Sequence, residues 1–179
     1  MKTSILILFF PVLIFAQKNL ISNGNFDTNT DSWRGDTATS NRFYKKTGAG
    51  SCMINQFVGN EWKGIDQISA IPKDVFAIAF SVYIKSDGIE GGKETYNAGV
   101  MTVEFTTSSG QNISYESIAQ VTGTTDWVLY KKTVVVPADA RKFRTMLALA
   151  QTAGTIYFDD VKAIAISEAA YQQLISQKN

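Results

Sequence analysis

Short segments in which apolar and polar residues alternate recur along most of the chain. The clearest segment is 76–85, where every second residue is a large apolar one: Phe76, Ile78, Phe80, Val82 and Ile84. A period of two is typical of a β-strand with one buried face. Turn residues separate similar segments, which are expected at 51–58, 64–71, 99–106, 112–118, 127–136 and 143–150. No strong helical pattern lies between them, so the pattern predicts an all-β sandwich.

The last apolar segment, 154–166, contains an acidic residue. Strict alternation places Asp159 on one face with Tyr157, Val161, Ala163 and Ala165, and we expect this mostly apolar face to point to the core. A buried carboxylate is costly unless it is paired, hydrogen-bonded or bound to a metal. The sequence therefore predicts a partner for Asp159.

The first residues have a different pattern. Lys2 precedes an apolar run from Ile5 to Phe15, and residues 1–16 are expected to be a secretory signal peptide cleaved between Ala16 and Gln17. The run is shorter than the roughly 20 residues that span a bilayer, so no membrane span is expected. The expected location is outside the cytoplasm: secreted, periplasmic or at the cell surface.

Two further parts of the chain are expected after the signal peptide. Residues 17–166 are expected to form the β-sandwich domain, and residues 167–179 a tail or a short helix that Ser167 could cap.

Composition excludes several classes of function. The net charge is +1 and no basic run is present, which argues against a nucleic-acid surface. The chain has no histidine, so a Ser-His-Asp triad is excluded and catalytic zinc is not expected. The one cysteine, Cys52, cannot form an intrachain disulfide and is expected to be a buried thiol.

Three motifs in order carry a family resemblance. They are Asn19-Leu-Ile-Ser-Asn-Gly-Asn-Phe-Asp27 with Trp33, then Trp127 with Val134-Val-Val-Pro137, and finally Ile156-Tyr-Phe-Asp-Asp-Val161. Together they resemble galactose-binding-like jelly rolls, in particular carbohydrate-binding modules of the CenC type (families 4, 9 and 22) and their xylan-binding relatives. The resemblance implies a jelly-roll β-sandwich of two antiparallel sheets, in which Trp33 and Trp127 pack in the core.

The resemblance also implies a structural calcium ion that ties the first strand to the last. The matching carboxylates are Asp27, where the family usually has Glu, and Asp159; oxygens around Asn25 and from the turn that ends at Ser51 would complete the shell. The alternative is that the two carboxylates only accept backbone N–H bonds.

Candidate ligand contacts follow from the chemistry of sugar recognition, in which exposed rings stack on the sugar and polar groups bond its hydroxyls. Trp62 lies in a polar setting, Gly59–Gly64, and matches a stacking ring of the xylan-binding relatives. The remaining candidates lie on expected non-core faces: Tyr83, Lys85, Glu104, Tyr115, Tyr130 and Arg144, with Gln151 as a further neighbour. Tyr96, in the loop, could fold over a ligand.

Three functions remain open at this point. The leading expectation is a secreted, non-catalytic protein that binds a poly- or oligosaccharide, with a separate glycan-degrading enzyme as a further partner. The second is an extracellular protein-interaction or spacer domain of the same fold. The third is a glycoside hydrolase or polysaccharide lyase, for which Glu61, Glu104 and Glu116 provide carboxylates but no evident pair.

Overall fold

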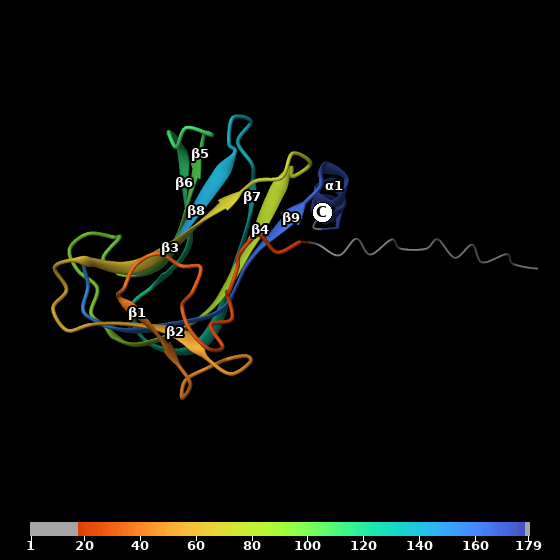
Figure 1. Ribbon diagram of the computed structural model, residues 1–179. Helices are drawn as coiled ribbons and strands as arrows, with labels where there is room; N and C mark the ends of the chain where they lie inside the picture. Colours follow the sequence, from red (N-terminus) through yellow and green to blue (C-terminus); the bar gives the residue numbers. More distant parts are fainter. Residues whose placement is uncertain (1–17, 178–179) are drawn as a thin grey trace, which may run out of the picture.

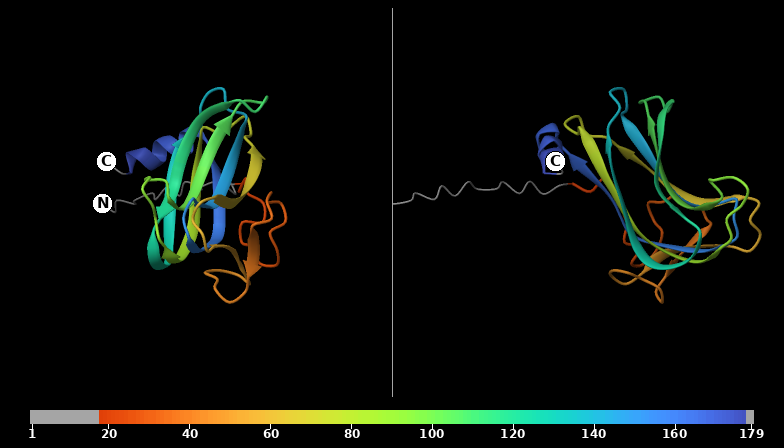
Figure 2. Two further views of the ribbon diagram at one scale, coloured as in Figure 1. Left: turned by 90° about the vertical axis from the view of Figure 1, so that its left-hand side faces the viewer. Right: turned by 180° about the vertical axis from the view of Figure 1, so that it is seen from behind.

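The computed structural model describes residues 18–177, which form two antiparallel sheets that face each other (Figure 1). The five-stranded sheet has the order β1 (Ala38–Asn41), β2 (Ser51–Gln56), β9 (Gly154–Ile166), β4 (Ala77–Ile89) and β7 (Gly123–Val135). The four-stranded sheet has the order β3 (Trp62–Ala70), β8 (Lys142–Ala150), β5 (Ala98–Thr106) and β6 (Asn112–Val121). The long strands β4, β7 and β9 curve along their length (Figure 2).

The inward faces of the two sheets form one apolar core. At its centre Phe80 of β4 lies edge-on to Phe143 of β8, with ring centroids 5.5 Å apart, and Phe105 of β5 packs beside both. All three rings are buried. The alternation of 76–85 and 99–106 therefore indicated the core faces correctly, and the predicted all-β sandwich is confirmed.

Some expectations about single residues need correction. Trp33 is buried as expected, whereas Trp127 is only half-buried on the edge strand β7. Cys52 is fully buried, and burial raises the pKa of its thiol, so it is an inert core residue. The short strand β1 has no clear alternation and was not predicted.

The predicted faces of β9 are wrong in its first half. Ile156 and Phe158 point into the core opposite Ser86 and Ile84, whereas Tyr157 and Asp159 lie on the outer side of the sheet. The reason is a bulge near Asp160, whose φ of 50° breaks strict alternation. Beyond the bulge Ala163 faces the core, as expected.

The segment before β1 joins the two sheets. Leu20 N donates to Ala163 O of β9 at 2.8 Å, and Gln67 of β3 bonds the main chain of Ser22 in both directions. Gly24 is required because a Cβ there would lie 2.1 Å from Val161 O. The first recognised motif is therefore a bridge between β9 and β3.

The tail forms the helix α1 (Glu168–Ser176), capped by the Ser167 hydroxyl, which accepts from Ala170 N. Tyr171 packs on Phe76 at 5.2 Å between ring centroids, although no residue of the helix is buried. The helix lies beside the first described residues (Figure 1).

Between residues 18 and 177, no helix is long and apolar enough to cross a membrane. The predicted signal peptide lies outside the described residues.

Candidate functional site

The outer face of the four-stranded sheet brings most of the predicted contacts together. Strand register aligns outward-facing residues in rows across β3, β8, β5 and β6. The row at one end contains Trp62, Ala150 and Ala98, and the next contains Gly64, Ala148, Val100 and Gln120. Further along lie Asp66, Met146, Thr102 and Ser117, and then Ile68, Arg144, Glu104 and Tyr115. We call this surface the open face.

Two aromatic rings stand at one end of the open face. Trp62 and Tyr96, the latter from the β4–β5 connection, stack with centroids 6.3 Å apart and planes 23° from parallel. They remain 47% and 45% exposed. Beside them the floor of the face is a small apolar cluster on β5 and β8: Ala98, Val100, Ala148 and Ala150. These four residues are themselves buried, so the apolar surface that a ligand can reach at this end belongs to the two rings.

Charged side chains follow in the next rows. Arg144 lies between two carboxylates: its Nη2 is 3.1 Å from Asp66 Oδ1, and its Nη1 is 3.4 Å from Glu104 Oε2. The hydrogen bond that Arg144 donates to Asp66 is the main cause that raises the pKa of Arg144, so this guanidinium stays charged. Arg34 binds the other oxygen of Asp66, with Nε at 2.8 Å. Two cations, Arg34 and Arg144, and two anions thus form one paired network, in which the Arg34 side chain is exposed.

Tyr115 extends this network on β6. It is 55% exposed and lies directly opposite Glu104 in the strand register. The open face therefore presents rings at both ends, with hydrogen-bonding groups between them.

The structure separates the other candidates from this face. Tyr83 and Lys85 lie on the outer side of the five-stranded sheet, opposite Asp159 and Tyr157. Tyr130 pairs with Val82 and packs against the core. Gln151 lies in the bend after β8 with a φ of 47°. Of the seven predicted sugar contacts, four share the open face: Trp62, Glu104, Tyr115 and Arg144.

Two charged residues of the paired network were not predicted, Asp66 and Arg34. Alternation from Trp62 places Asp66 on the same side, so its position was readable from the sequence. Arg34 was not, because it reaches Asp66 through an isolated bridge between the N-terminal segment and β3.

The four residues predicted to hold calcium lie around one loop, residues 42–50, which joins β1 to β2. Asp159 Oδ2 accepts from Lys46 N and Thr47 N at 2.7 Å each, and its Oδ1 accepts from the Thr47 hydroxyl at 3.1 Å. Asp27 accepts from Ala49 N and from the Asn25 amide. The Ser51 hydroxyl donates to Tyr44 O, within the same loop.

These oxygens fit calcium in chemical type, because calcium prefers carboxylate, amide and carbonyl oxygens. The side-chain ligands are too few to complete a calcium shell, since no group of three or more Asp, Glu, Cys or His side chains gathers anywhere in residues 18–177. Main-chain oxygens would have to supply the remainder. The hydrogen bonds already give the buried Asp159 the partners that the sequence predicted, and burial still raises its pKa.

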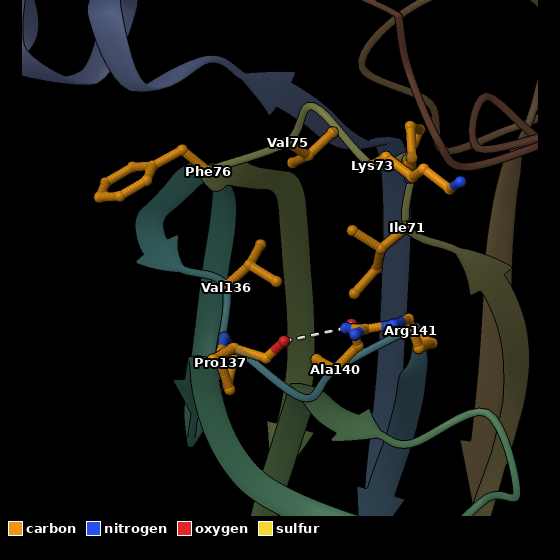
Figure 3. A pocket seen from close by; sticks show the side chains of 10 residues that line it. Ile71, Lys73, Val75, Phe76, Val136, Pro137, Ala140 and Arg141 are labelled. Carbon is orange, nitrogen blue, oxygen red and sulfur yellow. Dashed lines mark hydrogen bonds between the residues drawn. The ribbon is translucent and has the colours of Figure 1, made fainter.

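A separate depression of about 540 Å³ opens at one end of the sandwich. It lies between the β3–β4 and β7–β8 connections, and Figure 3 shows Ile71, Val136 and Ala140 facing it. Arg141 reaches across its rim but donates to Ala138 O at 2.9 Å, so its guanidinium is already engaged. The lining is largely apolar and carries none of the predicted site residues.

Neither a protein-family model nor a curated protein matches the chain. Solved structures match its fold. The enzymatically active domain of bacteriophage CBA120 tailspike protein 4 has a TM-score of 0.68 at 14% identity, over 83% of this chain. The chain spans only 21% of that tailspike chain.

Two binding modules match over nearly their whole length. The CBM22-1 xylan-binding domain from Paenibacillus barcinonensis Xyn10C has a TM-score of 0.59 at 16% identity, over 85% of this chain and 97% of that one. A family 16 carbohydrate-binding module has a TM-score of 0.56 at 18% identity, over 81% and 99%. Identities this low establish the fold alone. The chain thus has the jelly-roll β-sandwich fold of carbohydrate-binding modules.

Proposed function

We propose that this protein binds a neutral poly- or oligosaccharide on its open face and catalyses no reaction there. The observation that carries the proposal is the stacked, exposed pair Trp62 and Tyr96 beside an apolar floor and a row of hydrogen-bonding groups. Binding modules of the same fold, one of them named for xylan, support the class of ligand.

Sugar rings would contact the aromatic end of this face. Two ring faces that both contact a sugar need about 7–8 Å between them, because each carbon contact takes about 3.5–4 Å. The Trp62 and Tyr96 centroids are 6.3 Å apart. A sugar would therefore stack on the free side of the pair, or the pair would separate to admit it.

The charged network would bind hydroxyl groups. The carboxylates of Asp66 and Glu104 can accept hydrogen bonds, and the guanidiniums of Arg144 and Arg34 can donate them. Because two cations face two anions here, the open face offers no surplus charge for an acidic sugar. This balance favours a neutral glycan.

The same pairing argues for binding over glycoside hydrolysis. Hydrolysis needs one carboxylic acid that donates a proton and a second carboxylate as base or nucleophile. Both carboxylates of this face are instead engaged by the same guanidinium, that of Arg144.

A glycan array followed by isothermal titration calorimetry tests the proposal. For the neutral glycan that the array selects, Trp62→Ala is expected to weaken affinity about tenfold, since a stacking contact worth about 1.4 kcal/mol is lost. The melting temperature should change little because Trp62 is half-exposed. The control is Phe43→Ala, which removes an exposed ring near the other sheet and should leave affinity unchanged. Equal affinity of Trp62→Ala and wild type would refute this site, and a chain that binds no glycan would favour the spacer alternative.

A further inference from the structure

The loop between β1 and β2 exposes a run of cations and rings. Its first five residues, Arg42-Phe43-Tyr44-Lys45-Lys46, are all exposed, and Phe43 is 91% exposed. The loop projects beside β1 and β2 at the bottom of Figure 1. None of these five residues belongs to the open face.

Hydrogen bonds hold this loop in place although its tip is exposed. Asn41 Oδ1 accepts from Phe43 N at 2.9 Å and from Tyr44 N at 2.8 Å. Asp159 accepts from the main chain of Lys46 and Thr47 at the other side of the tip. The exposed ring of Phe43 is thus presented by an anchored loop, which lowers the entropy lost when a ligand binds.

Cations and rings continue from the loop onto the outer side of the five-stranded sheet. Lys46 Nζ lies 5.4 Å from the ring centroid of Tyr83, and Lys85 Nζ lies 5.8 Å from that of Tyr44. The Tyr44 ring packs on Tyr157 at 5.2 Å. We call this surface the cation–ring strip, formed by Arg42, Phe43, Tyr44, Lys45, Lys46, Tyr83 and Lys85.

The strip carries unpaired positive charge. Within residues 18–177, no carboxylate lies within 4.0 Å of the charged nitrogens of Arg42, Lys45 or Lys46. Lys85 pairs with Asp126 at 3.4 Å, and the Asp126 side chain is 88% exposed. Two further carboxylates are near: Asp159 is buried beneath the loop, and Asp87 follows Lys85 on β4. Three of the four cations of the strip therefore have no carboxylate partner, although Lys45 Nζ donates to Arg42 O at 3.0 Å.

We propose that the cation–ring strip binds an acidic polysaccharide of the uronate type. The exposed rings would stack on sugar faces, and the cations would pair with carboxylates repeated along the chain. An extended polymer fits this strip because its cations and rings continue from the loop onto the sheet. An anionic membrane is less suited, because one projecting ring, Phe43, provides little apolar area for insertion.

The test measures binding of polygalacturonate by titration calorimetry in the presence of a chelator, which removes calcium bridges between polymer and protein. The NMR amide signals of residues 42–50, recorded with calcium and with chelator, check that the loop keeps its conformation in this buffer. Fully methyl-esterified polygalacturonate provides the same sugar without its charge. We expect binding of the acidic form only, with affinity that falls as salt rises. Phe43→Ala and the double variant Arg42→Gln/Lys45→Gln should each weaken it about fivefold, whereas Trp62→Ala should not.

Two matched variants distinguish a specific site on the strip from nonspecific electrostatic attraction of the anionic polymer. Lys73→Gln/Lys142→Gln removes the same charge from exposed positions elsewhere, so it should keep full affinity. Asp126→Asn frees Lys85 and should raise affinity about twofold.

Several results would overturn the proposal. They are equal loss in both double variants, equal binding of the esterified polymer, and binding that vanishes in Trp62→Ala. Binding of phosphatidylglycerol vesicles without binding of polygalacturonate would also overturn it, in favour of a membrane surface. Because the neutral glycan depends on Trp62 and the acidic one on Phe43, either proposal can fail while the other stands.

Discussion

Asp159 illustrates what a single residue of this sequence could and could not reveal. Its place among apolar residues correctly indicated a buried carboxylate with partners, and its side chain is fully buried with three hydrogen-bond donors. The face was not predictable, because the bulge at Asp160 depends on a positive φ that no glycine marks in the sequence. The partners were not predictable either, since they are main-chain N–H groups more than 100 residues away.

Asp159 also predicts a pH dependence of stability. Burial raises its pKa above the ordinary 3.8, against the opposing effect of the Thr47 and Lys46 N–H donors. The folded protein therefore holds this proton more tightly than the unfolded chain. The stabilisation from protonated Asp159 is complete below pH 3.8 and is lost as the pH rises through the raised pKa.

The prediction is tested by melting wild type and Asp159→Asn in chelator from about pH 3 to 7. Asn keeps one side-chain oxygen, which can accept from Lys46 N and Thr47 N in place of Asp159 Oδ2, so the variant removes the titrating group at a cost of about 1 kcal/mol. The wild type should lose stability relative to the variant as pH rises, because only the wild type titrates at this position. A constant difference between the two proteins across this range would contradict the account.

We also propose that Asp27 and Asp159 hold a structural calcium ion with main-chain oxygens of the loop, and melting with added calcium tests this. A bound cation favours the ionised carboxylate, so added calcium should raise the melting temperature more at higher pH. Identical melting with calcium and with chelator at every pH would refute the ion and leave the hydrogen-bonded loop as the whole explanation.

At the scale of elements, the N-terminal segment determines how the two sheets are joined. Gly24 O accepts from Val161 N at 2.9 Å, and a Cβ added to Gly24 would overlap Val161 O. Gly24→Ala is expected to destabilise the fold by about 2–4 kcal/mol, because main-chain atoms cannot move aside as a flexible side chain could.

Gly110→Ala is the matched control for that variant. It lies at a turn where an added Cβ meets nothing within 4 Å, although its φ of 90° makes alanine cost about 1 kcal/mol. Urea unfolding compares the two variants with wild type. If Gly24→Ala cost no more than Gly110→Ala, the segment would not be the bridge described above.

Strand alternation explains which site residues were predictable. It fixes the side of a strand on which a residue lies, and for Trp62, Glu104, Tyr115 and Arg144 that side is the open face. It does not reveal which sheet a strand joins, since that depends on pairing between distant segments. Tyr83 and Lys85 were assigned to the right side of β4, but β4 belongs to the other sheet.

At the scale of the whole molecule, the two sheets present different chemistry to solvent. The open face has exposed rings and charges that pair with one another. The outer side of the five-stranded sheet and the loop beside it have rings next to cations, of which only Lys85 has a carboxylate partner. Under our two proposals, the protein would bind two kinds of polymer at once, one on each sheet.

The central claim is that the open face binds a neutral glycan, and NMR mapping tests it most directly. The backbone amide and Trp62 indole signals would be followed while the neutral glycan chosen by the array is added. We predict shifts concentrated at the Trp62 indole and at the amides of Gly64, Ala98, Ala148 and Arg144, with the loop 42–50 unchanged. Saturable shifts confined to that loop or to the end depression, with the open face unmoved, would contradict the claim.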